Sequence, residues 1–148
     1  MNEIPTKSSE LTMAQQIANA ASALQLQRTG VAPGAVTVVL SDQTLVITLH
    51  GALSAAEQAL ARTPQGAAQV QEYHRQLFLS SAETLRQEIR RITGVEVREA
   101  AAEVEPASGA VVHAFTSGTM VQIFLLAGNL AADAWNGGAV ASSQGTIP

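Results

Sequence analysis

The sequence contains few residues of the kinds that catalyse reactions or bind metals. Its histidines are His50, His74 and His113, and it has no cysteine. Without cysteine the chain can form no disulfide, thiolate nucleophile or zinc–thiolate site. No two histidines have the close helical spacing of a zinc site, and no His-Glu motif accompanies them. The sequence therefore predicts no metal, no cofactor and no catalytic residue, and we expect a protein that is not an enzyme.

His74 and Arg75 are the candidates for binding a small ligand. Both lie in a segment whose apolar spacing predicts a long helix, and His74 falls on its apolar face. A pocket between this helix and a sheet would bring them to a ligand. The commoner role for such a histidine is a buried side chain satisfied by one hydrogen bond. A separate hypothesis is an enzyme that uses His113 with a nearby glutamate.

Three further residues are candidates for an interface. Arg86 and Arg90 are four residues apart, so they share a helix face and could receive an acidic partner or a phosphate. The alternative is that these cations, near the end of the helix, compensate its dipole. Trp135 is the single tryptophan. It could lock the C-terminal segment onto the core or anchor a subunit interface, and both roles remain open.

An acidic stretch follows the long helix. In a strand, Glu99, Glu103 and Glu105 could share a face that holds a metal or a cationic partner, but charges on an edge strand more commonly serve to prevent aggregation. Its members are Glu96, Glu99, Glu103 and Glu105.

Composition narrows the class of protein further. The chain has 148 residues and a net charge of −4, which gives no basic footprint for nucleic acid and disfavours anionic membrane surfaces. Much of its apolar content is alanine, which buries little area, so a homo-oligomer would add burial to a thin core. No signal peptide is visible at the N-terminus, and the longest apolar run, 121–127, is broken by Gln122. This run is too short to span a bilayer, so we expect a cytoplasmic protein that does not insert into membranes.

The periodicity of the chain predicts an α+β fold. We expect a mainly antiparallel sheet, formed by an N-terminal β-hairpin plus two or three C-terminal strands and packed with three helices. The second hairpin strand, 44–50, is partly apolar on both sides, which predicts some cover on each face of the sheet. The expected helices are 10–28, 55–62 and 65–93, with a bend or restart at Ser80, and the expected strands are 35–40, 44–50, 95–104, 110–115 and 119–127.

Residues that typically begin or end helices set the expected boundaries of the elements. Gly30 and Gly94 are placed to end helices, and Ser54 with Glu57 forms a capping-box pattern. We expect a flexible lead-in over 1–9, a single domain over 10–135 and a Gly/Ser/Ala-rich tail over 136–148 with little reason to fold alone.

Several of these motifs together resemble the MpsC family, formerly a domain of unknown function, in a form that looks cyanobacterial. They are Gly-Val-Ala-Pro at 30–33, Leu-Ser-Ala-Ala-Glu at 53–57, Arg75, the helix stop within 89–97 and the closing strand 121–126. The resemblance spans roughly residues 10–127. The chain departs from the family pattern at Ala32, where a glycine is usual, and at Ser54, where a threonine is usual.

The resemblance implies an accessory of a sodium-translocating, membrane-potential-generating system, whose membrane components are related to inorganic-carbon transporters. It brings no established catalytic residues. It implies an accessory of a membrane-transport complex, and together with the thin core it leads us to expect a non-enzymatic adaptor that acts through protein–protein contacts as a homo-oligomer. The alternative is a small-ligand-binding sensor with a pocket between the sheet and the long helix.

Overall fold

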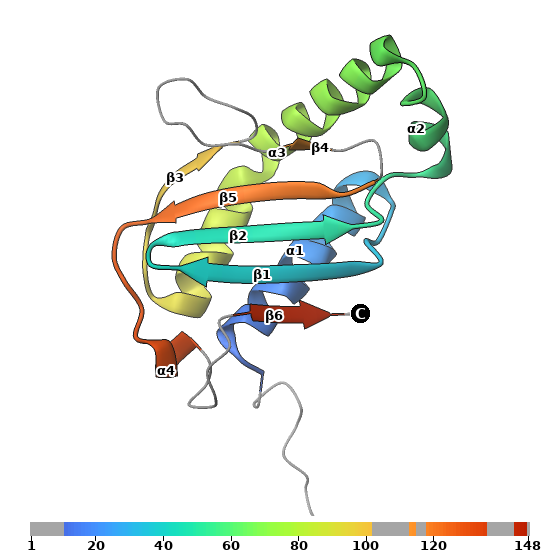
Figure 1. Ribbon diagram of the computed structural model, residues 1–148. Coiled ribbons are helices and arrows are strands. Elements are labelled where there is room, and N and C mark those ends of the chain that lie inside the picture. Colours follow the sequence, from blue (N-terminus) through green and yellow to red (C-terminus); the bar gives the residue numbers. More distant parts are fainter. Residues whose placement is uncertain (1–10, 102–112, 115–117, 136–143, 148) are drawn as a thin grey trace, which may run out of the picture.

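Two long helices pack against one face of an antiparallel sheet (Figure 1). The computed structural model describes residues 11–101, 113–114, 118–135 and 144–147. The helices are α1 (Met13–Thr29), α2 (Ala55–Leu60), α3 (Pro64–Thr93) and α4 (Ala132–Trp135). The strands are β1 (Ala35–Ser41), β2 (Thr44–His50), β3 (Val97–Ala101), β4 (His113–Ala114), β5 (Met120–Leu126) and β6 (Gln144–Ile147). The predicted α+β class is confirmed.

The hairpin of β1 and β2 lies near the centre of the sheet. The strand order is β3-β5-β2-β1-β6, with β4 paired to β5, and every described pairing is antiparallel. Ser41 pairs with Thr44, so the turn has two residues rather than the predicted three. Asp42 adopts the left-handed conformation with a φ of 55°, which Asp tolerates better than most residues. The strands β4 and β5 pair with each other as separate antiparallel strands.

Local signals set the ends of the helices as the sequence predicts. The hydroxyl of Ser54 accepts from the Glu57 N–H, and the Glu57 carboxylate accepts from the Ser54 N–H. Gly30 and Gly94 end α1 and α3 in the left-handed conformation, with φ of 78° and 77°. These contacts satisfy amides and carbonyls that a helix end would otherwise leave unpaired.

The predicted restart at Ser80 is wrong, because α3 runs from Pro64 to Thr93 without a break, while the predicted bend there stays a prediction. The hydroxyls of Ser80 and Ser81 donate to the Leu77 carbonyl oxygen at 3.0 and 2.8 Å. A serine that bonds back to the preceding turn can remain inside a helix. The Ser80 hydroxyl is thereby used within the helix and caps no new one. The result is one continuous helix that carries His74 in its first half and Arg90 in its last turn.

Alternation along the strands places the core on the helix side of the sheet. Every second residue of β1, β2 and β5 is buried, as expected when successive side chains point to opposite faces. Against these residues pack Ile17 of α1 and Phe78, Leu85 and Ile89 of α3. Both long helices lie on this one face (Figure 1), so the described residues provide no helix for the other face, where some cover was predicted.

The C-terminal segment contributes to the sheet. Residues 144–147 pair with Val36 to Val39 as an edge strand. The composition of this segment gives it little tendency to fold alone. The open edge of β1, however, presents unpaired backbone N–H and C=O groups with which the segment pairs. Trp135, only 2% exposed, packs in the core ahead of it. The predicted lead-in over 1–9 lies outside the described residues.

The connection between α2 and α3 requires glycine at position 66. A Cβ built on Gly66 would lie 1.8 Å from the carbonyl oxygen of Leu60. That oxygen belongs to the backbone at the end of α2, so it cannot move without moving the helix. We expect Gly66→Ala to lower the free energy of unfolding by about 1–3 kcal/mol, measured by urea denaturation.

The matched control is Gly34→Ala. A Cβ there would meet its nearest atom, the His50 carbonyl oxygen, at an ordinary 3.8 Å. Equal losses of stability in both variants would show that the close approach at Gly66 is not what constrains this connection.

Candidate functional site

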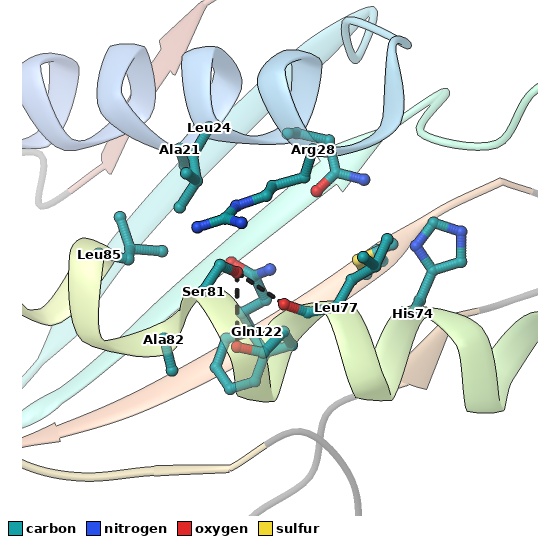
Figure 2. A pocket seen from close by; sticks show the side chains of 12 residues that line it. Ala21, Leu24, Arg28, His74, Leu77, Ser81, Ala82, Leu85 and Gln122 are labelled. Atoms are coloured by element: carbon teal, nitrogen blue, oxygen red, sulfur yellow. Dashed lines mark hydrogen bonds between the residues drawn. The ribbon is translucent and has the colours of Figure 1, made fainter.

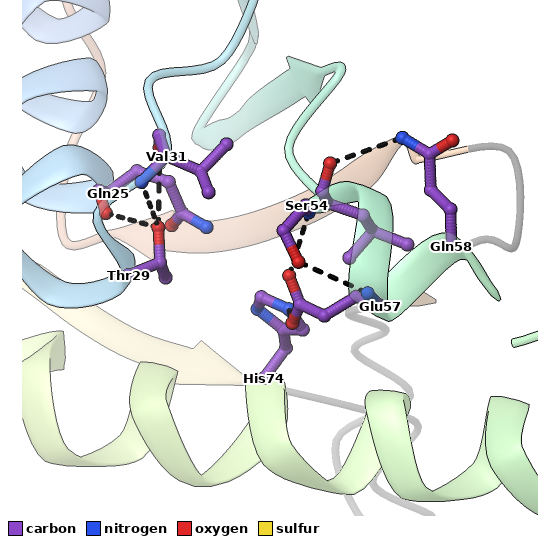
Figure 3. A network of polar contacts seen from close by, with 8 residues as sticks. Gln25, Thr29, Val31, Ser54, Glu57, Gln58 and His74 are labelled. Atoms are coloured by element: carbon purple, nitrogen blue, oxygen red, sulfur yellow. Dashed lines mark hydrogen bonds and ion pairs between the residues drawn. The ribbon is translucent and has the colours of Figure 1, made fainter. Parts of the chain in front are cut away.

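A short contact between the side chains of His74 and Glu57 connects α3 with α2 (Figure 3). The Nε2 atom of His74 lies 2.7 Å from Oε2 of Glu57, and their side chains are 3% and 18% exposed. An ionised carboxylate only accepts hydrogen bonds, so the proton of this bond is on Nε2. The contact ties α3 to the first turn of α2, 17 residues earlier in the chain.

Glu57 is held from two sides. Its other oxygen, Oε1, accepts from the Ser54 backbone N–H at 2.9 Å. Burial raises the pKa of the Glu57 carboxyl, but the hydrogen bonds from the Ser54 N–H and from His74 outweigh it, and the pKa falls below its usual value. Glu57 is therefore a fixed anion at neutral pH, and His74 is its fixed partner.

A groove opens beside this pair. It has a volume of about 330 Å³ and lies between the end of α1, α2 and the start of α3. Glu57 and Val70 form part of its wall, and Leu60 and Tyr73, 47% and 48% exposed, flank it. The ring of Tyr73 meets the His74 ring edge-on, with centroids 5.1 Å apart. The lining of the groove is mixed, with apolar and polar side chains and an acidic group at Glu57.

A second, smaller cavity lies on the other side of His74, between α1, α3 and β5 (Figure 2). The cavity has a volume of about 20 Å³, which is enough for one water molecule or one small polar group. Apolar side chains of both helices, with Met120 of β5, form the rest of its wall beside the polar groups. The polar groups that line it come from Gln25, Arg28, His74, Ser81 and Gln122.

The comparison with known families now identifies the chain. The family model described as "Na+-translocating membrane potential-generating system (MpsC)" matches residues 9–118. The chain belongs to the MpsC family. No curated protein and no solved structure matches it. Within the described ranges, the helices of this MpsC protein are too short or too polar to cross a membrane.

Of the two ligand residues predicted for this family member, the structure brings only His74 to a cavity. The guanidinium of Arg75 instead binds Glu72 on the surface of α3, with N–O distances of 3.0 and 2.7 Å. The hydrogen bonds from Arg75 and Gln76 lower the pKa of the Glu72 carboxyl to about 2. Arg75 lines neither of the two hollows.

The interface candidates have contacts within the chain. Arg86 donates to the Val97 carbonyl oxygen at 2.9 Å and so fastens the start of β3 to α3. Arg90 pairs with Glu96 at 3.1 Å, and both side chains are 64% exposed. Trp135 is buried in the core of its own chain, as expected of a residue that locks the C-terminal segment in place. The interface roles of Arg86, Arg90 and Trp135 stay predictions.

The other titratable candidates form no cluster in the part of the chain that the structure describes. His50 is exposed at the end of β2. The side chains of His113 and Glu99, and all of Glu103 and Glu105, lie outside the described residues. Among the described side chains, no group of three or more His, Asp or Glu is close enough to hold a metal ion.

Sequence reasoning missed the partner of His74 and the polar lining of the small cavity. Glu57 was assigned only a capping role, and a contact 17 residues apart leaves no spacing signal. Gln25 and Gln122 did leave one, because each interrupts an apolar face: Gln25 on α1, and Gln122 between Met120 and Phe124 on the buried side of β5.

The pair of Glu57 and His74 should make stability depend on pH. The folded-state pKa of Glu57 is lowered, so its contribution is present above the unfolded-state value near 4.5 and is lost as the pH falls through the folded value. We expect Glu57→Gln to be less stable than the wild type by about 1–2 kcal/mol at pH 7. Urea denaturation should show this difference shrinking as the pH falls below 4.5.

Glu72→Gln is the control, because it removes an exposed carboxylate that pairs with Arg75 on the surface of the same region of α3. It should change stability little at pH 7. A difference between wild type and Glu57→Gln that is the same at pH 7 and at pH 3 would contradict the role of the Glu57 charge.

Proposed function

We propose that this chain is a non-enzymatic accessory protein of a sodium-translocating, potential-generating membrane system. It works on the cytoplasmic side through protein–protein contacts, as a homo-oligomer, and neither inserts into the membrane nor binds nucleic acid. Membership of the MpsC family supports the link to sodium translocation. The feature that carries the proposal of protein contacts is the outer face of the sheet.

The outer face, defined as the side of β1, β2 and β5 opposite the helices, is apolar at its centre. An antiparallel sheet with one solvated face usually carries polar residues there. Here the central row across the three strands is aliphatic, and threonines make up much of the rest. The rows are Ser41, Thr44 and Leu125; Val39, Val46 and Ile123; and Thr37, Thr48 and Val121.

The charge pattern favours a second copy of the same chain as the occupant of the outer face. The strands β1, β2 and β5 contain no Asp, Glu, Lys or Arg. In a twofold dimer a patch meets itself, so a patch without charge meets no like-charge repulsion. The exposed side of α3, in contrast, carries the ion pairs Glu72–Arg75 and Glu88–Arg91, which are already satisfied within the chain. Self-association through the sheet leaves the helical side available to membrane components.

The contact of His74 with Glu57 serves folding rather than catalysis in this proposal. One carboxylate oxygen caps α2 and the other holds His74, so the anion is not free to take a proton from a substrate. The cavity beside His74 favours a second role, the binding of a small ligand that regulates the adaptor.

Val46→Lys tests the association. It places a charge at the centre of the outer face, where two copies would bury it unpaired, and burial of an unpaired charge is costly. We expect the wild type to elute as an oligomer in size-exclusion chromatography with light scattering, and Val46→Lys as a folded monomer.

Leu79→Lys is the matched control, because Leu79 is a 53% exposed leucine on α3, away from the sheet. It should leave the oligomer intact. A monomeric wild type would refute self-association, and an oligomer lost in Leu79→Lys but kept in Val46→Lys would move the interface to the helices.

The link to sodium translocation has its own test. In a host that lacks its own MpsC protein, the wild-type chain should restore a sodium-dependent membrane potential, measured with a potential-sensitive dye. Val46→Lys should restore less of it than Leu79→Lys. Full restoration by Val46→Lys would show that the outer face is not needed for the accessory role.

A further inference from the structure

The small cavity between α1, α3 and β5 contains two buried amides with unused hydrogen-bonding groups. Gln25 and Gln122 are 9% and 6% exposed, so each is more than nine-tenths buried. Nε2 of Gln25, a donor, and Oε1 of Gln122, an acceptor, have no hydrogen-bond partner in the described part of the chain. A buried polar group without a hydrogen-bond partner lowers the stability of the fold by about 1–3 kcal/mol. Two such groups in one cavity therefore indicate a hydrogen-bond partner that enters the cavity from the solvent.

A hydroxyl group combines an acceptor and a donor in the smallest volume. It accepts one hydrogen bond through its oxygen and donates one through its proton, which are the two functions that Gln25 and Gln122 leave open. The enclosed space of about 20 Å³ has room for one such group and little more. The hydroxyl of Ser81 lines the same space, but it donates to the carbonyl oxygen of Leu77 at 2.8 Å, so it retains only its capacity to accept.

A cationic side chain, that of Arg28, lines the same cavity. Arg28 follows Gln25 by three residues on α1, so their side chains leave neighbouring positions of one helix face. Figure 2 shows the Arg28 side chain extending from α1 toward Ser81 of α3. No ion pair or side-chain hydrogen bond engages Arg28 within the described residues, whereas Arg75, Arg86, Arg90 and Arg91 each have a partner. Among the residues that the structure describes, no Asp or Glu lines this cavity.

We propose that this cavity binds a small hydroxycarboxylate. The ligand's hydroxyl enters the enclosed space, accepts from Nε2 of Gln25 and donates to Oε1 of Gln122. Its carboxylate remains toward the opening and pairs with the guanidinium of Arg28, a group whose planar fork matches a carboxylate. This inference rests on the ligand-binding role proposed above. Its residues were not predicted from the sequence to bind a ligand. Binding in the cavity does not depend on association through the sheet.

Binding here would act on the packing of the helices. Gln25 and Arg28 belong to α1, Gln122 belongs to β5, and α3 forms the facing wall. A ligand that bridges the first two elements holds them together and stabilises the native state in proportion to its occupancy. His74, which also lines the cavity, connects it to Glu57 and hence to the groove beside α2.

The first arm of the test compares two ligands that differ by one hydroxyl. Glycolate should raise the unfolding temperature of the full-length chain with increasing concentration at constant ionic strength. Acetate, which has the carboxylate but not the hydroxyl, should bind about tenfold more weakly, since it leaves both amides unpaired. Dissociation constants from isothermal titration calorimetry measure the difference. Equal effects of acetate and glycolate, or no effect of glycolate because the cavity holds only water, would overturn the proposal.

The second arm uses variants. Arg28→Gln should weaken glycolate binding about tenfold or more, because it removes the charged pair. The control is Arg62→Gln, an exposed arginine that lines neither hollow and should bind glycolate as the wild type does. Equal weakening in the two variants would reduce the effect to net charge and refute the site.

Gln122→Leu separates binding from folding. Replacing the orphan amide by an apolar group removes its desolvation cost, so the free protein should be as stable as the wild type or more so. The same variant should lose the preference for glycolate over acetate, and a retained preference would contradict the assignment of Gln122. The monomeric Val46→Lys variant should still bind glycolate, so failure of the outer face and failure of the cavity give different results.

Discussion

The alternation of side chains along β1, β2 and β5 is the constraint on which the rest of the structure depends. Buried and partly exposed residues succeed one another without a break in all three strands. A shift of one residue in register would exchange the two faces completely. Because the larger side chains point to one side, α1 and α3 both pack there, and Ile17, Phe78 and Ile89 meet over the same strands. The division of the molecule into a helical side and an open side follows from this.

The helical side is fastened by polar contacts at its two ends. Near one end, Glu57 caps α2 and holds His74 of α3. Near the other, Arg86 reaches the backbone of Val97 and fixes the start of β3. Between these two points lies the cavity with the unpaired amides of Gln25 and Gln122. A ligand there would complete the polar contacts of the helical side, while the sheet remains available for a second copy. The two proposals therefore use opposite faces of one domain.

Local signals made much of the fold predictable. Turn and cap residues act within a few positions of themselves, so Gly30, Gly94 and the pair Ser54 and Glu57 indicated the ends of helices correctly. The hairpin followed from alternation and composition. At Ser80 the local signal was misleading, because a serine hydroxyl that can cap a new helix can equally bond back to the turn before it.

What could not be predicted depends on residues far apart in the chain. Residues 144–147 form a strand because the edge of β1 is there to pair with them, and nothing in their own composition requires it. The contact of Glu57 with His74 joins residues 17 positions apart, and the cavity depends on the packing of α1 on α3. Gln25 and Gln122 were visible as interruptions of apolar faces, but their meeting in one cavity required the tertiary structure.

The most direct test of the central claim, that the outer face of the sheet joins two copies of the chain, uses the absence of cysteine. Thr48→Cys introduces a single thiol on that face, and Gln76→Cys introduces one on the exposed side of α3. With a short bismaleimide reagent, we expect a covalent dimer from Thr48→Cys and little from Gln76→Cys at the same protein concentration. A dimer formed only by Gln76→Cys, or by neither variant, would contradict the account.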